Sequence, residues 1–143
     1  MHIHHRIDQA GFILPVSRSL TQLLFNVLST APDMPPTTQA VTLNFRDPQY
    51  SSERGGYHPV EIRLIRLNEG WRFDYVTDFG FVGTVYPELE KILDFSWTQR
   101  YVFESQLGDL TDAEGRALYA LWQQNFVSYW YADAYTTTVS WEI

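Results

Sequence analysis

The residues best suited to chemistry gather in one stretch, residues 44–64, with the sequence NFRDPQYSSERGGYHPVEIRL. Arg46 can hold a carboxylate or a phosphate, and His58 can act as an acid or a base near neutral pH. A carboxylate from Glu61 or Asp47 could orient the His58 ring. The stretch therefore offers the parts of a small-molecule site or of a hydrolase-like active site.

The same stretch has the composition of a structured loop. Asp47-Pro48 suits the first two positions of a type I turn. Gly55 and Gly56 accept positive φ at little steric cost. The proline after His58 favours an extended backbone at the start of a strand. We therefore expect an ordered loop that is longer than an ordinary hairpin connection, and long ordered loops often carry function.

The candidate site comprises the loop residues that could bind a ligand or shape the loop, together with one aspartate from the later sequence TDFG. These residues are Arg46, Asp47, Tyr50, Glu53, Gly55, Gly56, His58, Glu61 and Asp78. Each could instead be structural, with Arg46 paired to Asp47 or Glu53 and His58 bonded to a backbone carbonyl. We favour the structural interpretation, and assign no catalytic residue, because no nucleophile, metal-ligand set or second catalytic motif accompanies the stretch.

Three histidines at the N-terminus, His2, His4 and His5, could chelate a divalent metal. An ordered metal site needs ligands in fixed geometry, and no acidic residue lies closer than Asp8. We therefore predict no metal and no cofactor. The absence of cysteine excludes disulfides, thiolate catalysis and Cys-ligated metals, and it fits a reducing, cytoplasmic location.

The length and composition fit one compact domain. The chain has 143 residues, of which 45% are hydrophobic and 16% aromatic. We expect a flexible N-terminal segment, residues 1–12, followed by a single domain, residues 13–143. No apolar run approaches the roughly 18 residues that span a bilayer, and the N-terminus has no apolar stretch suited to a signal peptide, so we expect no membrane association.

The charge distribution argues against nucleic-acid binding. The net charge is −7, and residues 73–143 carry three basic and eleven acidic groups. The nine arginines and one lysine form no run, whereas nucleic-acid binders cluster such residues against phosphates. The acidic second half could meet a basic protein partner, although a net charge of this size also simply maintains solubility.

Periodicity predicts the elements that carry the loop. Residues 17–30 place leucines and Val27 on one helical stripe, with Ser17 or Ser19 as the cap. Residues 41–45 alternate as a strand with one buried face. Residues 60–67 alternate until Ile65, where a bulge, a strand end or burial of both faces would explain the change of phase. Residues 71–78 alternate in turn, with Tyr75 on the same face as Phe73, and should form a hairpin with the strand before them.

The second half contains further elements. Pro87 suits the first turn of a short helix carrying Leu89, Ile92 and Leu93, and residues 95–105 weakly indicate a strand or hairpin. The DFG sequence lacks every other kinase motif. Thr111 and Glu114 form a capping box for a helix that extends to about residue 131, and residues 135–141 alternate as a last strand. This order predicts an α+β fold, an antiparallel sheet with helices packed mainly on one face.

An aromatic run, FVSYWYADAY at residues 126–135, could line an apolar pocket or a partner surface. We assign Phe126 and Trp130 to the core, because aromatics at helical spacing usually pack inward. Tyr129, Tyr131 and Tyr135 cannot all face one core direction. Some of these tyrosines should therefore be exposed, which favours an interface.

Three stretches carry a resemblance to a known family: VTLNFRDPQYSSERGGYHPVEIRL, WRFDYVTDFGFVGTVYPELEKILDF and LYALWQQNFVSYW. Together they resemble the bacterial domain-of-unknown-function family numbered 2787, from about residue 13 to the last strand. The resemblance implies a small single-domain bacterial protein of unknown function and supplies no catalytic or binding residues. The N-terminal HIHH and the tyrosine-rich end are not part of the resemblance.

Two classes of function remain open. We favour a non-enzymatic interaction or regulatory module that binds an unidentified protein through the 46–61 loop, the exposed aromatics or the acidic half. The alternative is a small-molecule-binding protein or hydrolase-like enzyme built on Arg46, His58 and Glu61, with Asp78 nearby. A concave pocket in which these side chains converge would favour the alternative, and a flat loop with side chains bonded to neighbours would favour the module.

Overall fold

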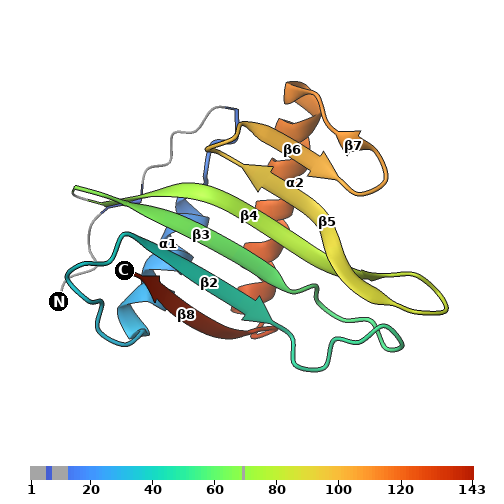
Figure 1. Cartoon of the computed structure of the whole chain (residues 1–143), viewed down its shortest axis with the longest axis horizontal. Helices are drawn as coiled ribbons and strands as arrows, with labels where there is room; N and C mark the ends of the chain where they lie inside the picture. The colour runs from blue at the N-terminus through green and yellow to red at the C-terminus, as the bar shows by residue number, and fades with distance from the viewer. Residues whose placement is uncertain (1–5, 8–12, 69) are drawn as a thin grey trace.

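The computed structural model describes residues 6–7, 13–68 and 70–143 (Figure 1). Its elements are β1 (Arg6–Ile7), α1 (Arg18–Thr30), β2 (Ala40–Arg46), β3 (Val60–Leu67), β4 (Gly70–Val82), β5 (Glu88–Ser96), β6 (Tyr101–Glu104), β7 (Gly108–Asp109), α2 (Asp112–Tyr131) and β8 (Thr136–Glu142). Within these residues the strands form one sheet in the order β7-β6-β5-β4-β3-β2-β8. Neighbours in this order are antiparallel, and β1 adds a parallel pair with the start of β4.

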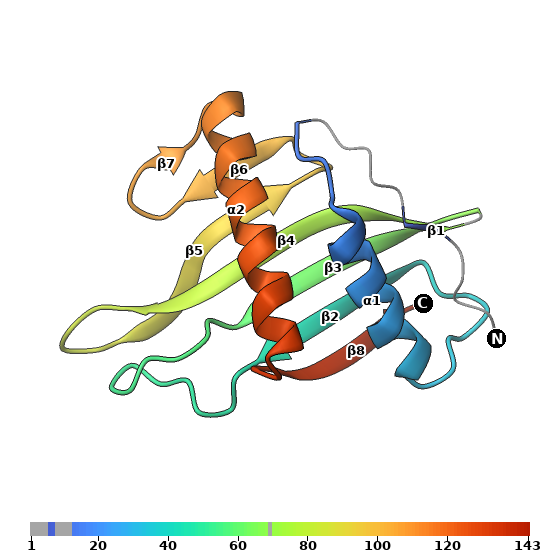
Figure 2. The same ribbon diagram turned by 180° about the vertical axis from the view of Figure 1, so that it is seen from behind.

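Both helices lie on the same face of the sheet, as the view in Figure 2 shows, and the opposite face is uncovered in Figure 1. The core lies between the helices and the sheet, where large side chains such as Trp71, Tyr119 and Phe45 are almost fully buried. The predicted α+β fold, an antiparallel sheet with helices on one face, is confirmed.

The local signals for the helices are also confirmed. Ser17 caps α1 by accepting a hydrogen bond from the backbone N–H of Leu20 at 3.1 Å, and the leucine stripe of α1 is buried. Thr111 caps α2 in a capping box with Glu114. Gly115 lets α2 approach the sheet closely, because a Cβ there would lie 2.8 Å from the Val102 side chain.

A β-bulge in β4 decides which of its side chains face the helices. Arg63 pairs with Tyr75 and Leu64 with Phe73, so Asp74 is an extra residue on β4. The bulge that was one possible explanation for the change of phase at Ile65 thus lies on the partner strand β4. β3 itself keeps its alternation of more and less buried residues. The prediction that Tyr75 shares a face with Phe73 is wrong: Tyr75 bonds Glu61, and Val76 joins the core instead.

The short helix expected after Pro87 is wrong, because this segment is the strand β5. Leu89, Ile92 and Leu93 have helical spacing, yet residues 88–96 pair with β4 along their whole length. Gly80 supports this pairing: a Cβ at that position would lie 2.8 Å from Cγ1 of Ile92. Tertiary pairing with a long neighbouring strand outweighs the local helical pattern.

The two ends of the described chain lie against the sheet. Ile7 is buried and pairs with Trp71 at the start of β4, while residues 1–5 and 8–12 lie outside the described residues, as does Glu69 in the β3–β4 connection. The predicted last strand is confirmed as β8, which forms an edge of the sheet beside β2. The weakly indicated hairpin within residues 95–105 is formed by the end of β5 and β6.

Candidate functional site

Asp47 folds the loop between β2 and β3. Its Oδ1 accepts the backbone N–H of Gln49 at 2.9 Å, and its Oδ2 accepts that of Tyr57 at 3.1 Å. Gly56, at φ +130°, leaves room for this carboxylate, because a Cβ there would lie 2.7 Å from Asp47 Oδ2. The turn at Asp47 and the positive φ of Gly55 and Gly56 are as the sequence predicts.

Tyr50 joins this loop to the β4–β5 hairpin. Its hydroxyl accepts the backbone N–H of Phe81 at 3.0 Å, and its ring stacks on the Phe81 ring with centroids 5.2 Å apart. The Tyr50 ring also meets the His58 ring edge-on at 5.5 Å. Figures 1 and 2 show the loop and the hairpin projecting from the same end of the sheet. Tyr50 therefore positions His58 against β4.

His58 and Asp78 form a hydrogen-bonded pair. His58 Nδ1 lies 2.7 Å from Asp78 Oδ1, and the indole N–H of Trp122 on α2 donates to Asp78 Oδ2 at 3.0 Å. Each oxygen of this carboxyl group thus meets an N–H donor, as an ionised carboxylate requires. Asp78 is buried, and the β4 bulge turns it towards α2. The aspartate therefore fixes both the His58 ring and α2.

This pairing changes the acidity of His58. The hydrogen bond with Asp78 raises the pKa of His58 above its usual 6.5, burial acts in the opposite direction, and the charge of Asp78 raises the pKa further. A carboxylate beside an imidazole stabilises the charged ring. His58 therefore stays protonated to higher pH than a free histidine.

The second nitrogen of His58 has no protein partner among the described residues. The His58 side chain is 43% exposed, and Nε2 has no hydrogen-bond partner among the described residues. Gly80 lets the ring lie close to β4, since a Cβ there would be 3.2 Å from His58 Cε1. Asp78 and Gly80 thus hold the ring with one nitrogen bonded and the other open.

His58 lines a cleft of about 440 Å³ between α2, the loop and the sheet. We call it the α2 cleft; it is lined by Gly56, Tyr57, His58, Val60, Asp78, Trp122, Asn125, Phe126, Tyr129 and Tyr135. Its aromatic rings pack on one another: the centroids of Tyr57 and Tyr129 are 4.9 Å apart, and those of Phe126 and Tyr135 are 5.4 Å apart. Burial, followed by the charge of Asp78, raises the pKa of Tyr135, so this tyrosine remains a neutral wall of the cleft.

Other predicted site residues lie elsewhere. Arg46 is exposed, and its carbonyl accepts the hydroxyl of Thr136 at 3.1 Å. Glu53 is exposed at the far end of the loop. Glu61 faces the uncovered side of the sheet, where it accepts a hydrogen bond from the Tyr75 hydroxyl. Of the proposed set Arg46, His58, Glu61 and Asp78, the structure brings together only His58 and Asp78.

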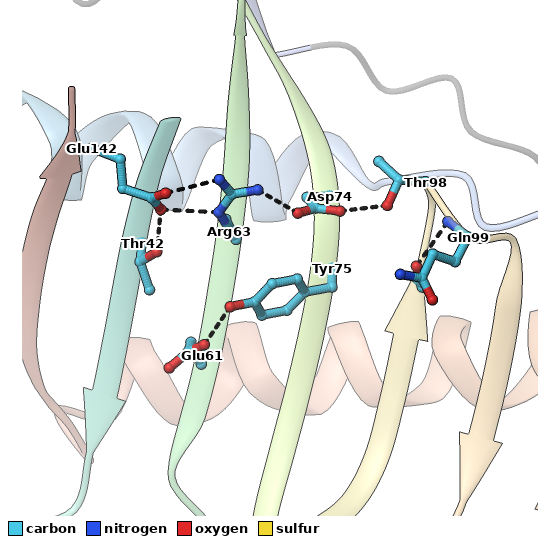
Figure 3. Close-up of polar contacts among 9 residues, drawn as sticks. Thr42, Glu61, Arg63, Asp74, Tyr75, Thr98, Gln99 and Glu142 are labelled. Carbon is cyan, nitrogen blue, oxygen red and sulfur yellow. Dashed lines mark hydrogen bonds and ion pairs between the residues drawn. The ribbon is translucent and has the colours of Figure 1, made fainter. Parts of the chain in front are cut away.

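The uncovered face of the sheet carries its own polar network, drawn in Figure 3. Arg63 donates to both carboxylate oxygens of Glu142, at 2.9 and 2.8 Å, and to Asp74 at 2.6 Å. Thr42 also donates to Glu142, at 3.0 Å. These bonds link β8, β2, β3 and β4 across one face. Arg63 is bonded to two carboxylates from different strands, so the network ties the four strands together.

Sequence analysis missed the contribution of α2 to the site. Trp122 and Asn125 were not among the predicted site residues, although a buried tryptophan N–H generally needs an acceptor and Asp78 is one of the few buried carboxylates. Some of Tyr129, Tyr131 and Tyr135 were expected at the surface, and Tyr131 and Tyr129 are exposed, while Tyr129 and Tyr135 also form a wall of the cleft. Trp122 lies 44 residues from Asp78 in the chain, so no local spacing signals their contact.

Other kinds of site find less support in the described part of the chain. There, no group of three or more His, Asp or Glu side chains could hold a metal ion; His2, His4 and His5 lie outside the described residues. None of the described helices is long and apolar enough to cross a membrane.

The fold and the cleft together define a small α+β protein with one antiparallel sheet, two described helices on one face and a histidine–aspartate pair opening into an aromatic cleft. The chain belongs to the family described as protein of unknown function DUF2787, whose pattern matches residues 18–140. The resemblance found in the sequence is thereby confirmed. No curated protein matches the chain significantly.

Two solved structures from Vibrio cholerae are similar over nearly the whole chain. The hypothetical protein VC0508, from the VSP-II pathogenicity island, shares 35% identity with a TM-score of 0.81, covering 92% of this chain and 97% of its own. The conserved hypothetical protein VC1805, from pathogenicity island VPI-2, shares 35% identity with a TM-score of 0.79, covering 94% and 99%. VC1805 is described as sharing structural homology with the human P32 protein. These relatives support the fold and leave the function open.

Proposed function

We propose that this protein binds a small, largely apolar ring-bearing molecule in the α2 cleft, with His58 making the polar contact. The observation that carries the proposal is the Asp78-oriented His58 ring, which lines an aromatic cleft of about 440 Å³ and whose Nε2 has no partner among the described residues. Small-molecule sites commonly have volumes of roughly 300–1,000 Å³ and combine apolar walls with a few fixed polar groups.

Binding is better supported than hydrolysis. The described residues place no serine or threonine hydroxyl in hydrogen-bond contact with His58, so the pair has a base but no partner to activate. Arg46 and Glu61, the other groups of the hydrolase-like hypothesis, lie away from the cleft. The geometric criterion set out from the sequence is met only in part, because His58 and Asp78 meet in a pocket while Arg46 and Glu61 lie outside it. This partial convergence supports a small-molecule site without the hydrolase-like set.

A fragment screen followed by two-dimensional NMR tests this function. Aromatic fragments that bind should shift the indole N–H signal of Trp122 and the ring signals of His58. The control variant Tyr86→Ser changes an exposed residue between β4 and β5 that does not line the cleft, and it should bind the same fragments equally well. If no fragment shifts the cleft signals at millimolar concentration, the proposal fails.

A protein-interaction function remains a second candidate because of the β4–β5 hairpin. Phe81, Val82, Val85, Tyr86 and Leu89 are exposed there, with Tyr86 at 85% and Val85 at 77%. Exposed apolar residues gathered on one element often mark a contact surface. The double variant Val85→Ser, Tyr86→Ser should keep the thermal stability of the wild type and lose any partner that the hairpin holds. Retention of every partner captured by the wild type would exclude the hairpin as the contact.

A further inference from the structure

The bonding of His58 restricts the polar group that a ligand can present to it. His58 Nδ1 donates a hydrogen bond to Asp78 Oδ1 at 2.7 Å, so the proton stays on Nδ1 in both charge states of the ring. Nε2 is then a hydrogen-bond acceptor when the ring is neutral and a donor when it is charged. A ligand atom at Nε2 must therefore meet a nitrogen whose role changes with the charge state of the ring.

The charges around the ring weigh against an anionic ligand. The lining of the α2 cleft contains no lysine or arginine, and its charged side chains are Asp78 and, when protonated, His58 itself. The Asp47 carboxylate lies just behind Gly56. The remaining titratable walls, Tyr57, Tyr129 and Tyr135, are phenols. A carboxylate ligand would be attracted by one positive charge only while His58 is protonated. With the ring neutral, Asp78 and Asp47 would repel it.

A neutral hydroxyl fits both states of Nε2. It donates to the neutral ring and accepts from the charged ring, whereas an N–H group can only donate and a carboxylate can only accept. The aromatic walls, among them Trp122 and Phe126, favour a flat ring carrying that hydroxyl. The Asn125 side chain, which also lines the cleft and has no partner among the described residues, can meet a second polar group.

Building on the proposed small-molecule function, we propose that the ligand of the α2 cleft is a phenol-type molecule, an aromatic ring whose neutral hydroxyl hydrogen-bonds to Nε2 of His58. The ring lies among the aromatic walls, and the His58–Asp78 pair selects the hydroxyl. The molecule is bound without a covalent change.

Three matched probes test the ligand class: 2-naphthol, its methyl ether 2-methoxynaphthalene, and 2-naphthoate. They share the same ring system and differ in the group offered to His58. An ether oxygen could accept from the charged ring, so the NMR titrations of the full chain are made at a pH high enough to keep the His58 ring neutral. Followed through the Trp122 indole signal, they should give a Kd for 2-naphthol about fivefold below that of the ether, the worth of one net hydrogen bond. The ¹⁵N signal of His58 Nε2 should move with 2-naphthol and stay unchanged with the ether.

The variant His58→Phe supplies the control. It should bind the ether as the wild type does and bind 2-naphthol no better than the ether. Because the Nε2 signal of the wild type reports the same contact without any substitution, the inference stays testable even if this variant fails to fold.

The outcomes separate the ligand class from the proposed function. Equal affinity for 2-naphthol and its ether, with clear shifts at Trp122, overturns the hydroxyl assignment and leaves a cleft that binds aromatic rings. Tightest binding of 2-naphthoate at neutral pH also overturns it, in favour of an anionic ligand. If none of the three probes shifts the cleft signals, both the ligand class and the small-molecule function fall.

Discussion

The two ring nitrogens of His58 have different surroundings. This difference bears on whether the residue is structural or part of a site. Its Nδ1 is bonded to Asp78, as a structural histidine would be, while Nε2 has no partner in the described part of the chain. The structural interpretation of His58 therefore accounts for one nitrogen and leaves the other for a ligand. A residue can fix its own loop and still contact a bound molecule.

The pair should make the stability of the protein depend on pH. Because the folded state raises the pKa of His58 above 6.5, the pair stabilises the fold fully below about 6.5 and loses this effect as pH rises through the folded pKa. The free energy of unfolding of the wild type should exceed that of His58→Gln by more at about pH 5.5 than at about pH 8.5. The partly exposed ring limits the effect to about 1 kcal/mol or less.

Urea denaturation of both proteins at several pH values measures this difference. Glutamine can keep one hydrogen bond to Asp78 but cannot titrate, so any pH-dependent gap belongs to the imidazole. A gap that is constant across this range, or that widens at high pH, would contradict the assignment of the pair.

Asp78 should matter more to stability than His58. In Asp78→Ala the buried indole N–H of Trp122 loses its acceptor, at a cost of about 1–3 kcal/mol, whereas the partly exposed His58 can turn to water. The cost should shrink in a Trp122→Phe background, which lacks the donor. Chemical denaturation of the two single variants and the double variant gives the coupling. Additive effects would show that the Asp78–Trp122 bond contributes nothing to folding.

At the scale of elements, α2 connects the site to the fold. Its capping box fixes where the helix begins, and its register then places Trp122, Asn125 and Tyr129 along the cleft. Thr111 accepts the backbone N–H of Glu114 at 3.2 Å, and Glu114 accepts that of Thr111 at 2.9 Å. The cap therefore contributes both to stability and to the position of the cleft wall.

Replacing the cap residue, Thr111→Ala, should lower the free energy of unfolding by about 1 kcal/mol. The exposed residue Thr37, which makes no side-chain hydrogen bond within the described chain, offers a matched control, and Thr37→Ala should change stability little. The urea midpoints of the two variants provide the comparison. An unchanged midpoint for Thr111→Ala would mean that the helix is stabilised elsewhere.

Local signals predicted the elements better than they predicted the site. Caps and alternation identified both helices and most strands, because those signals depend on residues near in sequence. The helix predicted after Pro87 is wrong because pairing with the strand β4 outweighs the helical spacing of this segment. A bulge at Asp74 determines which face of the sheet carries Asp78, and no local sequence pattern predicted the position of this bulge.

In the candidate site, too, features that depend on neighbouring residues could be predicted, and features that depend on distant residues could not. The alternation of Val60 and Ile62 against Glu61 already indicates that Glu61 faces away from the core, and the structure places it on the uncovered side of the sheet. The contact of Asp78 with Trp122 joins residues 44 positions apart. Such contacts follow from the tertiary arrangement of α2 over β4, so the sequence alone identified the histidine and the aspartate but not the cleft around them.

For the whole molecule, the two faces of the sheet have separate roles. The helix-covered face holds the core and the α2 cleft, while the uncovered face carries the network of Arg63, Asp74 and Glu142 (Figure 3). Arg63 hydrogen-bonds to both carboxylates. The bonds to Glu142 raise the pKa of Arg63 most, and the bond to Asp74 raises it further. The uncovered face therefore offers no free positive charge at its centre.

This distribution of charge predicts that the protein does not bind nucleic acid. The net charge is −7, and the basic residues are spread over β1, α1, β2, the β2–β3 loop, β3, β4, β5, the β5–β6 connection and α2 and form no run in the sequence. Binding to phosphates depends on clustered basic residues, because each neutralised phosphate releases a counterion. A fluorescently labelled random duplex, titrated with protein up to about 100 μM at about 150 mM salt, should keep its anisotropy. A micromolar complex that weakens steeply as salt rises would show a cationic surface that the described residues do not form, and the N-terminal histidines and Arg6 would then be the first residues to replace.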